Sequence, residues 1–194
     1  MVAPGGTLSD RSTPAERRDR RGMVIVYTGG GKGKTTAALG LALRAWGYGW
    51  KTLFVQFIKG TWHYGELEAA RRLHPSVEIR PMGVGFVHIM GDQLPLEEHR
   101  EAARKALSAV REEIAAERWD IIVLDEINVA ISERLLTAEE VLEVVSSRPA
   151  WMSLVLTGRN APGPLVEAAD LVTEMREVKH PFRQGIEAQQ GIDY

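Results

Sequence analysis

The chain has 194 residues, with 44% hydrophobic and 26% charged side chains and a formal net charge of -2. This length suits one domain with a sizeable core, and the near balance of charge predicts neither a nucleic-acid-binding surface nor attraction to an anionic membrane. No apolar run reaches the length of a bilayer span, and the N-terminal residues lack the apolar core of a secretory signal, so we expect a cytoplasmic protein. The chain has no cysteine, which excludes disulfides, a thiol nucleophile, and iron–sulfur or zinc sites held by thiolates.

Residues 1–22 are rich in arginine, proline, glycine and serine and contain few large apolar side chains. This composition predicts a flexible, charged N-terminal arm, in which residues 14–20 can become helical with Pro14 in the first turn. We therefore divide the chain into this arm, residues 1–22, and one domain, residues 23–194.

A phosphate-binding loop is predicted directly after the first strand, residues 23–27. The loop follows the pattern G-x-x-x-x-G-K-[ST] except that threonine replaces the first glycine. Its glycines allow backbone N–H groups to approach phosphate oxygens without an intervening Cβ, the lysine before the hydroxyl residue supplies charge, and the hydroxyl can bind Mg²⁺. The predicted phosphate-binding residues are Thr28, Gly29, Gly30, Gly31, Lys32, Gly33, Lys34, Thr35 and Thr36. Lys32 either adds charge to this site or faces water.

A helix is expected after the loop, because Leu39, Ala42, Leu43 and Trp46 recur at helical spacing. Its N-terminus favours anions, and Gly47 is expected to end it.

The second predicted strand, residues 51–58, ends at a loop that contains Lys59 and Trp62. Ligands of open α/β sheets bind beyond the carboxyl ends of the strands. We therefore interpret Lys59 as a phosphate contact and Trp62 as a flat apolar face for a ligand. The alternative is a solvated lysine and a packing tryptophan.

A helix over residues 65–73 and a short strand over residues 77–80 precede a glycine-rich, apolar loop at residues 81–92. Phe86 and His88 lie in this loop. Apolar loops of this kind mark a ligand or partner surface, although the segment can also pack against its own domain.

An amphipathic helix is predicted over residues 96–118 from the stripe Ala103, Leu107, Val110 and Ile114. The next strand ends in Asp125 and Glu126. Four apolar residues followed by two acids, C-terminal to a phosphate loop, form a Walker B pattern, which places a carboxylate near the metal. The alternative is two solvated acids at a strand end.

The remaining elements extend the same alternation of helices and strands. Thr137 and Glu140 form a capping box that begins a helix, which ends by Pro149. A strand over residues 151–156 leads to a polar loop with Arg159 and Asn160, a last strand is expected over residues 171–175, and the tail is polar and glycine-rich.

These motifs together resemble the P-loop type of corrinoid adenosyltransferases. The segments that carry the resemblance run in the order of that family from Met23 to Tyr194: TGGGKGKTTAALGLALRAWG, VQFIKGTW, GVGF, VLDEIN, LTGRNAP, VKHPF and QGIDY. The resemblance implies a RecA-like α/β domain with a mostly parallel sheet and helices on both faces, assembled as a homodimer. It also implies transfer of the 5′-deoxyadenosyl group of ATP to the cobalt of a reduced corrinoid.

The resemblance also implies roles for single residues. Thr35 and Glu126 are the expected Mg²⁺ contacts, with Asp125 beside them. Arg44, Arg159 and Asn160 are further candidates for the nucleotide site. In the family, ATP lies in the reverse sense along the loop, which leaves the ribose 5′ carbon open to attack.

The corrinoid loop departs from the family pattern at Val87 and His88, where threonine and tryptophan are usual. Aromatic groups there are expected to exclude the lower axial ligand of cobalt, because four-coordinate Co(II) is easier to reduce, and Phe86 can still do this. An imidazole at His88 either coordinates cobalt and opposes reduction or points away as a polar loop residue; we favour the second interpretation.

Co(I) is itself a strong nucleophile, so the protein needs only to position the 5′ carbon and stabilise the departing triphosphate, in which Lys34 takes part. Reduction of Co(II) is expected to need an external reductase, for which we expect a flavoprotein.

The alternative functions are a RecA-like ATPase or kinase, in which Glu126 activates the nucleophile, and a non-catalytic corrinoid carrier. The lack of a basic, aromatic groove disfavours a single-stranded-DNA-binding protein. The preferred corrinoid, and the choice between biosynthesis and salvage, do not follow from the sequence.

Overall fold

The computed structural model describes residues 19–60, 64–87 and 93–194. The strands are β1 (Val24–Thr28), β2 (Thr52–Gln56), β3 (Val77–Pro81), β4 (Ile121–Asp125), β5 (Ser153–Thr157) and β6 (Leu171–Glu174). The helices are α2 (Lys34–Gly47), α3 (Gly65–Leu73), α4 (Leu96–Ala116), α5 (Ile127–Ser132), α6 (Ala138–Ser147) and α7 (Gly163–Ala168), followed by a 3₁₀ helix, η1 (Pro181–Gln184).

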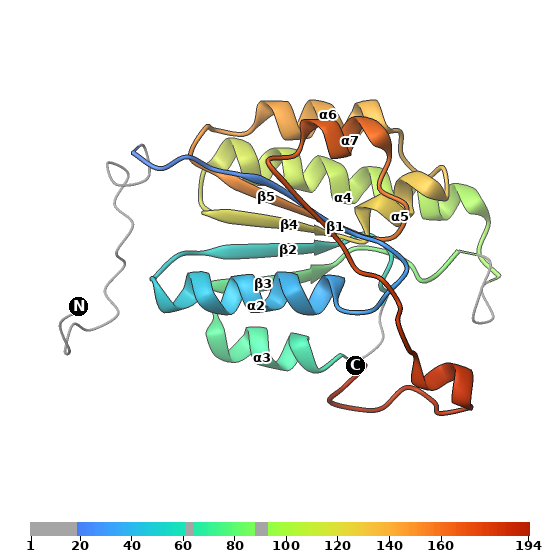
Figure 1. The fold of residues 1–194 in the computed structure, drawn as a ribbon. Helices are drawn as coiled ribbons and strands as arrows, with labels where there is room; N and C mark the ends of the chain where they lie inside the picture. Colours follow the sequence, from blue (N-terminus) through green and yellow to red (C-terminus); the bar gives the residue numbers. More distant parts are fainter. Residues whose placement is uncertain (1–18, 61–63, 88–92) are drawn as a thin grey trace.

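The six strands form one sheet in the order β3-β2-β4-β5-β1-β6, and every pair of neighbouring strands is parallel. Their carboxyl ends therefore lie along one edge, where the phosphate loop leaves β1 (Figure 1). β5 separates β1 from β4, so that the Walker B strand does not pair with the strand that carries the phosphate loop.

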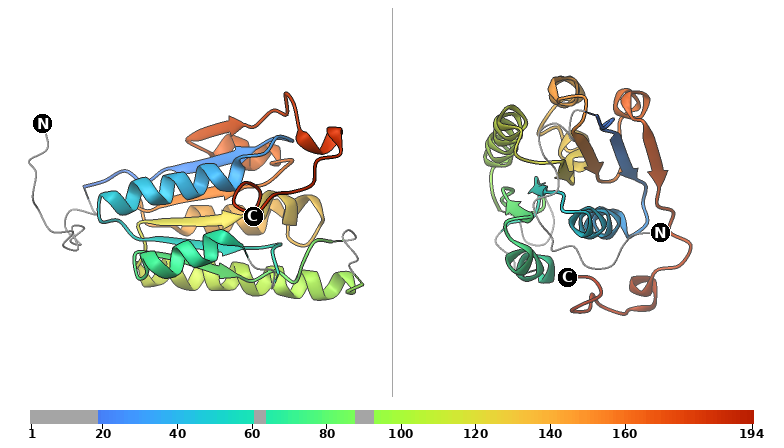
Figure 2. Two further views of the ribbon diagram at one scale, coloured as in Figure 1. Left: turned by 90° about the horizontal axis from the view of Figure 1, so that it is seen from below. Right: turned by 90° about the vertical axis from the view of Figure 1, so that its left-hand side faces the viewer.

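Successive strand residues point to opposite faces of the sheet, and each face is covered by helices. Val24, Leu53 and Ile122 pack with residues of α4, α5, α6 and α7, whereas Ile25, Phe54 and Val123 pack with residues of α2. Figures 1 and 2 show α2 and α3 on one face and α4, α6 and α7 on the other. Because both faces are covered, the inner strands β2, β4, β5 and β1 are mostly apolar along their length, whereas the edge strands β3 and β6 contain charged residues. The predicted α/β architecture, with a parallel sheet and helices on both faces, is confirmed.

Of the apolar positions that indicated α2, Leu39, Ala42, Leu43 and Trp46, only Ala42 belongs to its buried face. Its buried residues after Lys34 are Ala38, Ala42 and Ala45, because a helix packed closely on a sheet accommodates small side chains there. Leu43 is 57% exposed.

Two ends of the described chain lie against the sheet domain. Arg20, which the sequence placed in the arm, pairs with the buried carboxylate of Asp120 and stacks over Trp50 at 4.0 Å from the ring centroid. At the other end, the segment after β6 continues past the phosphate loop and returns toward α3 (Figure 1). Within the ranges described, none of the helices has both the length and the apolar character required to cross a bilayer.

Candidate active site

A cavity of about 850 Å³ lies at the carboxyl edge of the sheet. It is bounded by the phosphate loop, the exposed side of α2, the start of α3 and the C-terminal residues. Residues expected at a nucleotide or corrinoid site that line it are Gly31, Lys32, Gly33, Lys34, Thr35, Thr36, Lys59, Phe86, Glu126 and Arg159. The structure thus brings together side chains from five separate predicted motifs.

Lys34 is the first residue of α2 and is held inside the loop. The preceding Gly33 has a φ of 108°, a left-handed conformation that favours glycine. The ammonium of Lys34 donates to the carbonyl oxygens of Gly29 at 2.8 Å and Gly31 at 2.7 Å. Burial lowers the pKa of Lys34, and Arg159 lowers it further, while Glu126 and Asp125 act in the opposite direction.

The glycines of the phosphate loop allow another segment of the chain to pack closely against the loop, and they also allow a ligand to approach its backbone. A Cβ on Gly29 or Gly31 would lie 2.5 Å or 2.8 Å from the carbonyl oxygen of Met175, whereas a Cβ on Gly30 would meet nothing within 4 Å. The N–H of Gly31 donates to that same carbonyl oxygen at 2.6 Å. The segment after β6 therefore engages the N–H of Gly31.

Thr28, which replaces the first glycine of the loop pattern, has a structural role. Its hydroxyl oxygen accepts a hydrogen bond from the N–H of Ala161 at 3.1 Å and so connects the end of β1 to the loop after β5. Thr28 is not among the residues with a positive φ, so this position does not require glycine.

Asp125 is fully buried at the end of β4 and is surrounded by donors. Its Oδ1 accepts from the hydroxyls of Thr35 and Thr157, both at 2.8 Å, and its Oδ2 accepts from Nε2 of Gln56 at 3.2 Å. The carboxylate therefore links the phosphate loop to the ends of β2 and β5.

Glu126 follows Asp125 and lines the cavity. Its φ of 62° places the residue in the left-handed region, and its N–H donates to the hydroxyl oxygen of Thr157 at 2.9 Å. Burial, reinforced by the charge of Asp125, raises the pKa of the Glu126 carboxyl. A cation bound beside this carboxylate would favour its ionised form.

Lys59 lies on the same side of the cavity. Its ammonium is 2.9 Å from Oε1 of Glu66 and 3.8 Å from Oδ2 of Asp125, and it stands over the ring of Tyr64. Burial lowers the pKa of Lys59, but Asp125 and the hydrogen bond to Glu66 outweigh it and raise that pKa above its ordinary value. These contacts therefore fix the positive charge of Lys59 at the end of β2.

The C-terminal residues Gly191–Tyr194 form part of the cavity wall. Lys32 of the phosphate loop forms an ion pair with Asp193. This pairing favours neither of the predicted alternatives, a lysine that faces water or one that adds charge to the phosphate site. Leu39, Leu43 and Phe86 add apolar surface to the wall. Polyphosphate-binding and apolar surfaces therefore share one cavity.

Of the predicted site residues that the structure describes, Thr28, Gly29, Gly30, Asp125, Arg44 and Asn160 are not among those that line the cavity. Trp62 and His88 lie outside the described residues. Arg44 is exposed and does not line the cavity, although its neighbour Leu43 does. Asn160, with a φ of 56°, is exposed next to Arg159 and is not part of the wall.

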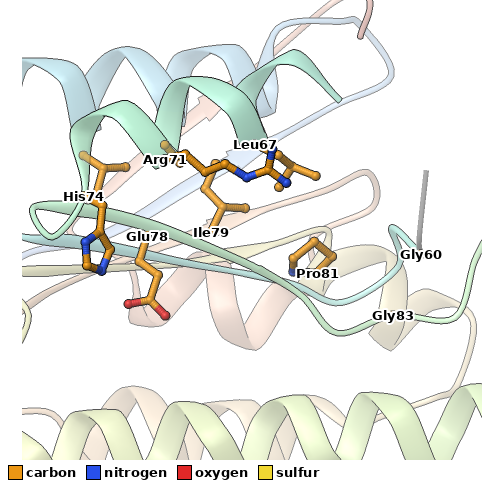
Figure 3. Close-up of a pocket in the computed structure, with 10 residues that line it drawn as sticks. Gly60, Leu67, Arg71, His74, Glu78, Ile79, Pro81 and Gly83 are labelled. Atoms are coloured by element: carbon orange, nitrogen blue, oxygen red, sulfur yellow. The ribbon is translucent and has the colours of Figure 1, made fainter. Parts of the chain in front are cut away.

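A second cavity, of about 660 Å³, lies between α3 and the edge strand β3 (Figure 3). It shares Ala70, Val77 and Ile79 with the first cavity. Its charged residues Arg71 and Glu78 are engaged by Glu68 and Arg80. These pairs leave the groove without the convergent polar groups of the first cavity.

The oxygen donors of the first cavity fit Mg²⁺. Among the described residues, no group of three or more His, Asp or Glu side chains forms a metal cage. Mg²⁺ does not require one, because it is usually held by one or two protein oxygens together with substrate phosphates and water. The hydroxyl of Thr35 and the carboxylate of Glu126, both in the cavity wall, supply such a set.

The phosphate loop, the Walker B strand and the parallel sheet define a P-loop nucleotide-binding protein. In its fold, the chain is similar to the flagellar accessory protein FlaH of Methanocaldococcus jannaschii, with a TM-score of 0.54 and 13% sequence identity over 80% of this chain and 71% of that one. The predicted RecA-like fold is confirmed.

Sequence comparison assigns the family. The model of the ATP:corrinoid adenosyltransferase family BtuR/CobO/CobP matches residues 20–194. The chain is 41% identical to a corrinoid adenosyltransferase of Escherichia coli over 93% of its own length and 89% of that protein. It is 40% identical to the corrinoid adenosyltransferase CobA of Salmonella typhimurium, again over 93% and 89% of the two chains. The chain belongs to this family and is an enzyme of the corrinoid adenosyltransferase class.

Three contributors to the site were not predicted: Gln56, Thr157 and the wall formed by Gly191–Tyr194. A hydroxyl or amide side chain at the end of a buried strand does not by itself indicate a functional residue. Its role depends on which strands are neighbours in the sheet, and the sequence alone did not predict that order.

Proposed function

We propose that the chain transfers the 5′-deoxyadenosyl group of ATP to Co(I) of a corrinoid and releases triphosphate. The observation that carries the proposal is one cavity lined both by Lys34, Thr35 and Glu126 and by the apolar side chains of Leu43 and Phe86. The first group suits a polyphosphate, and the second suits an apolar ring system.

The reaction forms one bond and breaks one bond. The electron pair of Co(I) attacks the 5′ carbon of ATP and forms a cobalt–carbon bond. The bond from that carbon to the triphosphate oxygen breaks, and its electron pair leaves with triphosphate. No side chain must act as the nucleophile, so the task of the protein is to position the reactants and stabilise charge.

Charge stabilisation is assigned to the loop and its neighbours. We assign the ammonium of Lys34 and the N-terminus of α2 to the phosphates, because helix N-termini favour anions, and Lys59 adds a fixed cation at the end of β2. Thr35 and Glu126 would hold Mg²⁺, which when bound neutralises part of the charge on the departing triphosphate. We assign to Asp125 the task of orienting Thr35, because its two oxygens already accept three hydrogen bonds.

Phe86 is assigned to the corrinoid. Its side chain lines the cavity and also packs against the core, which supports a fixed orientation. An aromatic ring held there would exclude a lower axial ligand from cobalt and make reduction to Co(I) easier.

The assembly and its surroundings follow from family resemblance. We propose a cytoplasmic homodimer that receives electrons from an external flavoprotein reductase, since the chain has no cysteine to hold an iron–sulfur cluster. Residues 1–22 are proposed as an arm, of which Arg20 and Arg21 are fixed to the domain by Asp120 and Asp170.

The test is an anaerobic assay with chemically reduced Co(I) corrinoid and Mg-ATP. We expect a light-sensitive alkylcobalt spectrum together with one equivalent of triphosphate. Release of ADP and phosphate would instead indicate an ATPase or kinase, and tight corrinoid binding without a new cobalt–carbon bond would indicate a carrier. Either of these results would overturn the proposal.

A further inference from the structure

Thr157 lies at the point where the acidic residues of the site meet. It is the last residue of β5, the strand between β1 and β4, and it is fully buried. Its hydroxyl donates to Oδ1 of Asp125 at 2.8 Å and accepts from the N–H of Glu126 at 2.9 Å. One hydroxyl therefore contacts both acidic residues of the Walker B pattern.

The hydrogen bond to Asp125 also affects Thr35. Both threonine hydroxyls donate to the same carboxylate oxygen, each at 2.8 Å. A hydroxyl has one proton and two lone pairs, so Thr35 uses its proton on Asp125 and keeps its lone pairs for a cation. Thr157 fixes the carboxylate that sets this orientation.

The hydrogen bond to Glu126 acts on the backbone. Glu126 has a φ of 62°, a region in which residues with a Cβ are uncommon and are retained where surrounding contacts enforce them. The contact that Thr157 makes is to the N–H of this same residue. It holds the turn that directs the Glu126 side chain toward the cavity.

We propose that Thr157 is a positioning residue that orients Thr35 and Glu126 for Mg²⁺ bound with the nucleotide triphosphate. This inference rests on the proposed function only in its assignment of the metal–nucleotide site, not in the identity of the acceptor. It predicts an effect on metal-dependent nucleotide binding, whereas a merely structural role predicts an effect on stability alone.

The experiment compares Thr157→Val, which removes both hydrogen bonds at nearly constant volume, with Thr157→Ser, which retains the hydroxyl. Thr52→Val is the matched control. Thr52 is also fully buried at a strand end, and its hydroxyl has no hydrogen-bond partner in the described structure. Each full-length variant is titrated with ATP by calorimetry, once with Mg²⁺ and once with a chelator.

For Thr157→Val we expect Mg-ATP binding to weaken by about tenfold to a hundredfold, the usual cost of losing a partner that orients a metal ligand. Binding of metal-free ATP should not change. Thr157→Ser and Thr52→Val should bind Mg-ATP like the parent chain. Thr157→Ala is measured in parallel and replaces the valine variant if the latter does not fold.

Equal weakening with and without Mg²⁺, or wild-type Mg-ATP binding by both the valine and alanine variants, would overturn the inference. Failure of the proposed function has a different signature. The parent chain would bind Mg-ATP and yet form no alkylcobalt product, while the difference between the valine and serine variants would persist.

Discussion

The ammonium of Lys34 donates to the carbonyl oxygen of Gly31 at 2.7 Å, inside the turn of the phosphate loop. A second bond joins it to the carbonyl of Gly29 at 2.8 Å, so the loop backbone fixes the cation from two sides. Gly29 and Gly31 are in turn packed against the chain after β6. The position of this charge therefore depends on contacts between the start and the end of the domain.

Lys34→Ala should abolish most activity while the fold is retained. We expect kcat to fall about a hundredfold to a thousandfold, the usual cost of removing one group that stabilises developing charge. The fold should persist because burial lowers the pKa of Lys34, so the charge is not a source of stability. Alkylcobalt formation and thermal unfolding measure the two effects.

The matched control for this variant is Lys105→Ala, since Lys105 lies on the exposed side of α4. This control should keep full activity. A Lys34→Ala protein that retained most of its adenosylation would refute the assigned role.

The sequence predicted the strands and the loop well because their signals are local. Four strands, β1, β2, β4 and β5, are largely buried apolar runs, and the loop residues from Gly29 to Thr35 follow one another in the chain. The capping box of Thr137 and Glu140, predicted from spacing, is present. By contrast, α5 and α7 have six residues each, too few to show a helical period.

The missed parts of the site depend on tertiary order. Thr157 has a role only because β5 lies beside β4, and Gly31 donates to Met175 only because β6 lies beside β1. Leu43, expected from its spacing to belong to an ordinary amphipathic helix, lines the cavity instead. Such relationships join residues far apart in the sequence, and no local pattern encodes them.

Glu126→Gln should weaken Mg-ATP binding and remove part of its pH dependence. The ionised carboxylate is the form that binds a cation. Because burial raises the pKa of Glu126 above 4.5, the neutral form persists to higher pH than for an ordinary glutamate. Mg-ATP affinity of the parent chain should therefore fall as the pH decreases through this raised pKa.

Calorimetric titrations across this pH range measure the effect. In Glu126→Gln the affinity should be lower by at least the roughly tenfold to hundredfold cost of disturbing a metal site, and its acid-side decline should be smaller. A parallel decline in both proteins would show that another group titrates.

Phe86→Ala should impair reduction of cobalt more than transfer of the adenosyl group. If the ring excludes an axial ligand, its removal lowers the Co(II)/Co(I) potential, and a tenfold change in a one-electron equilibrium corresponds to about 59 mV. We therefore expect the rate of adenosylation to fall by at least about tenfold when the assay begins from Co(II) with a reductase. With chemically reduced Co(I) the loss should be smaller.

Tyr48→Ala provides an aromatic control, because Tyr48 is 71% exposed at the end of α2 and does not line the cavity. It should behave like the parent chain in both assays. Equal losses for Phe86→Ala in the two assays would indicate a role in binding alone.

Glu113 should contribute to stability rather than to activity. Although burial opposes its ionisation, hydrogen bonds from Arg118, Arg80 and Trp119 lower the pKa of Glu113 to about 2. A shift from 4.5 to about 2 corresponds to about 3 kcal/mol, and solvent around the exposed Arg118 reduces this to about 1–3 kcal/mol.

Because the folded-state pKa is lowered, this stabilisation is present above pH 4.5 and is lost as the pH falls toward 2. Glu113→Gln should therefore lower the free energy of unfolding by about 1–3 kcal/mol at neutral pH, and the two proteins should converge in acid. Urea unfolding at several pH values measures this difference. Adenosylation by the folded variant should be unchanged, because Glu113 does not line the cavity. A difference in stability that stayed constant from neutral pH down to pH 2 would contradict the assignment, since a packing defect does not titrate.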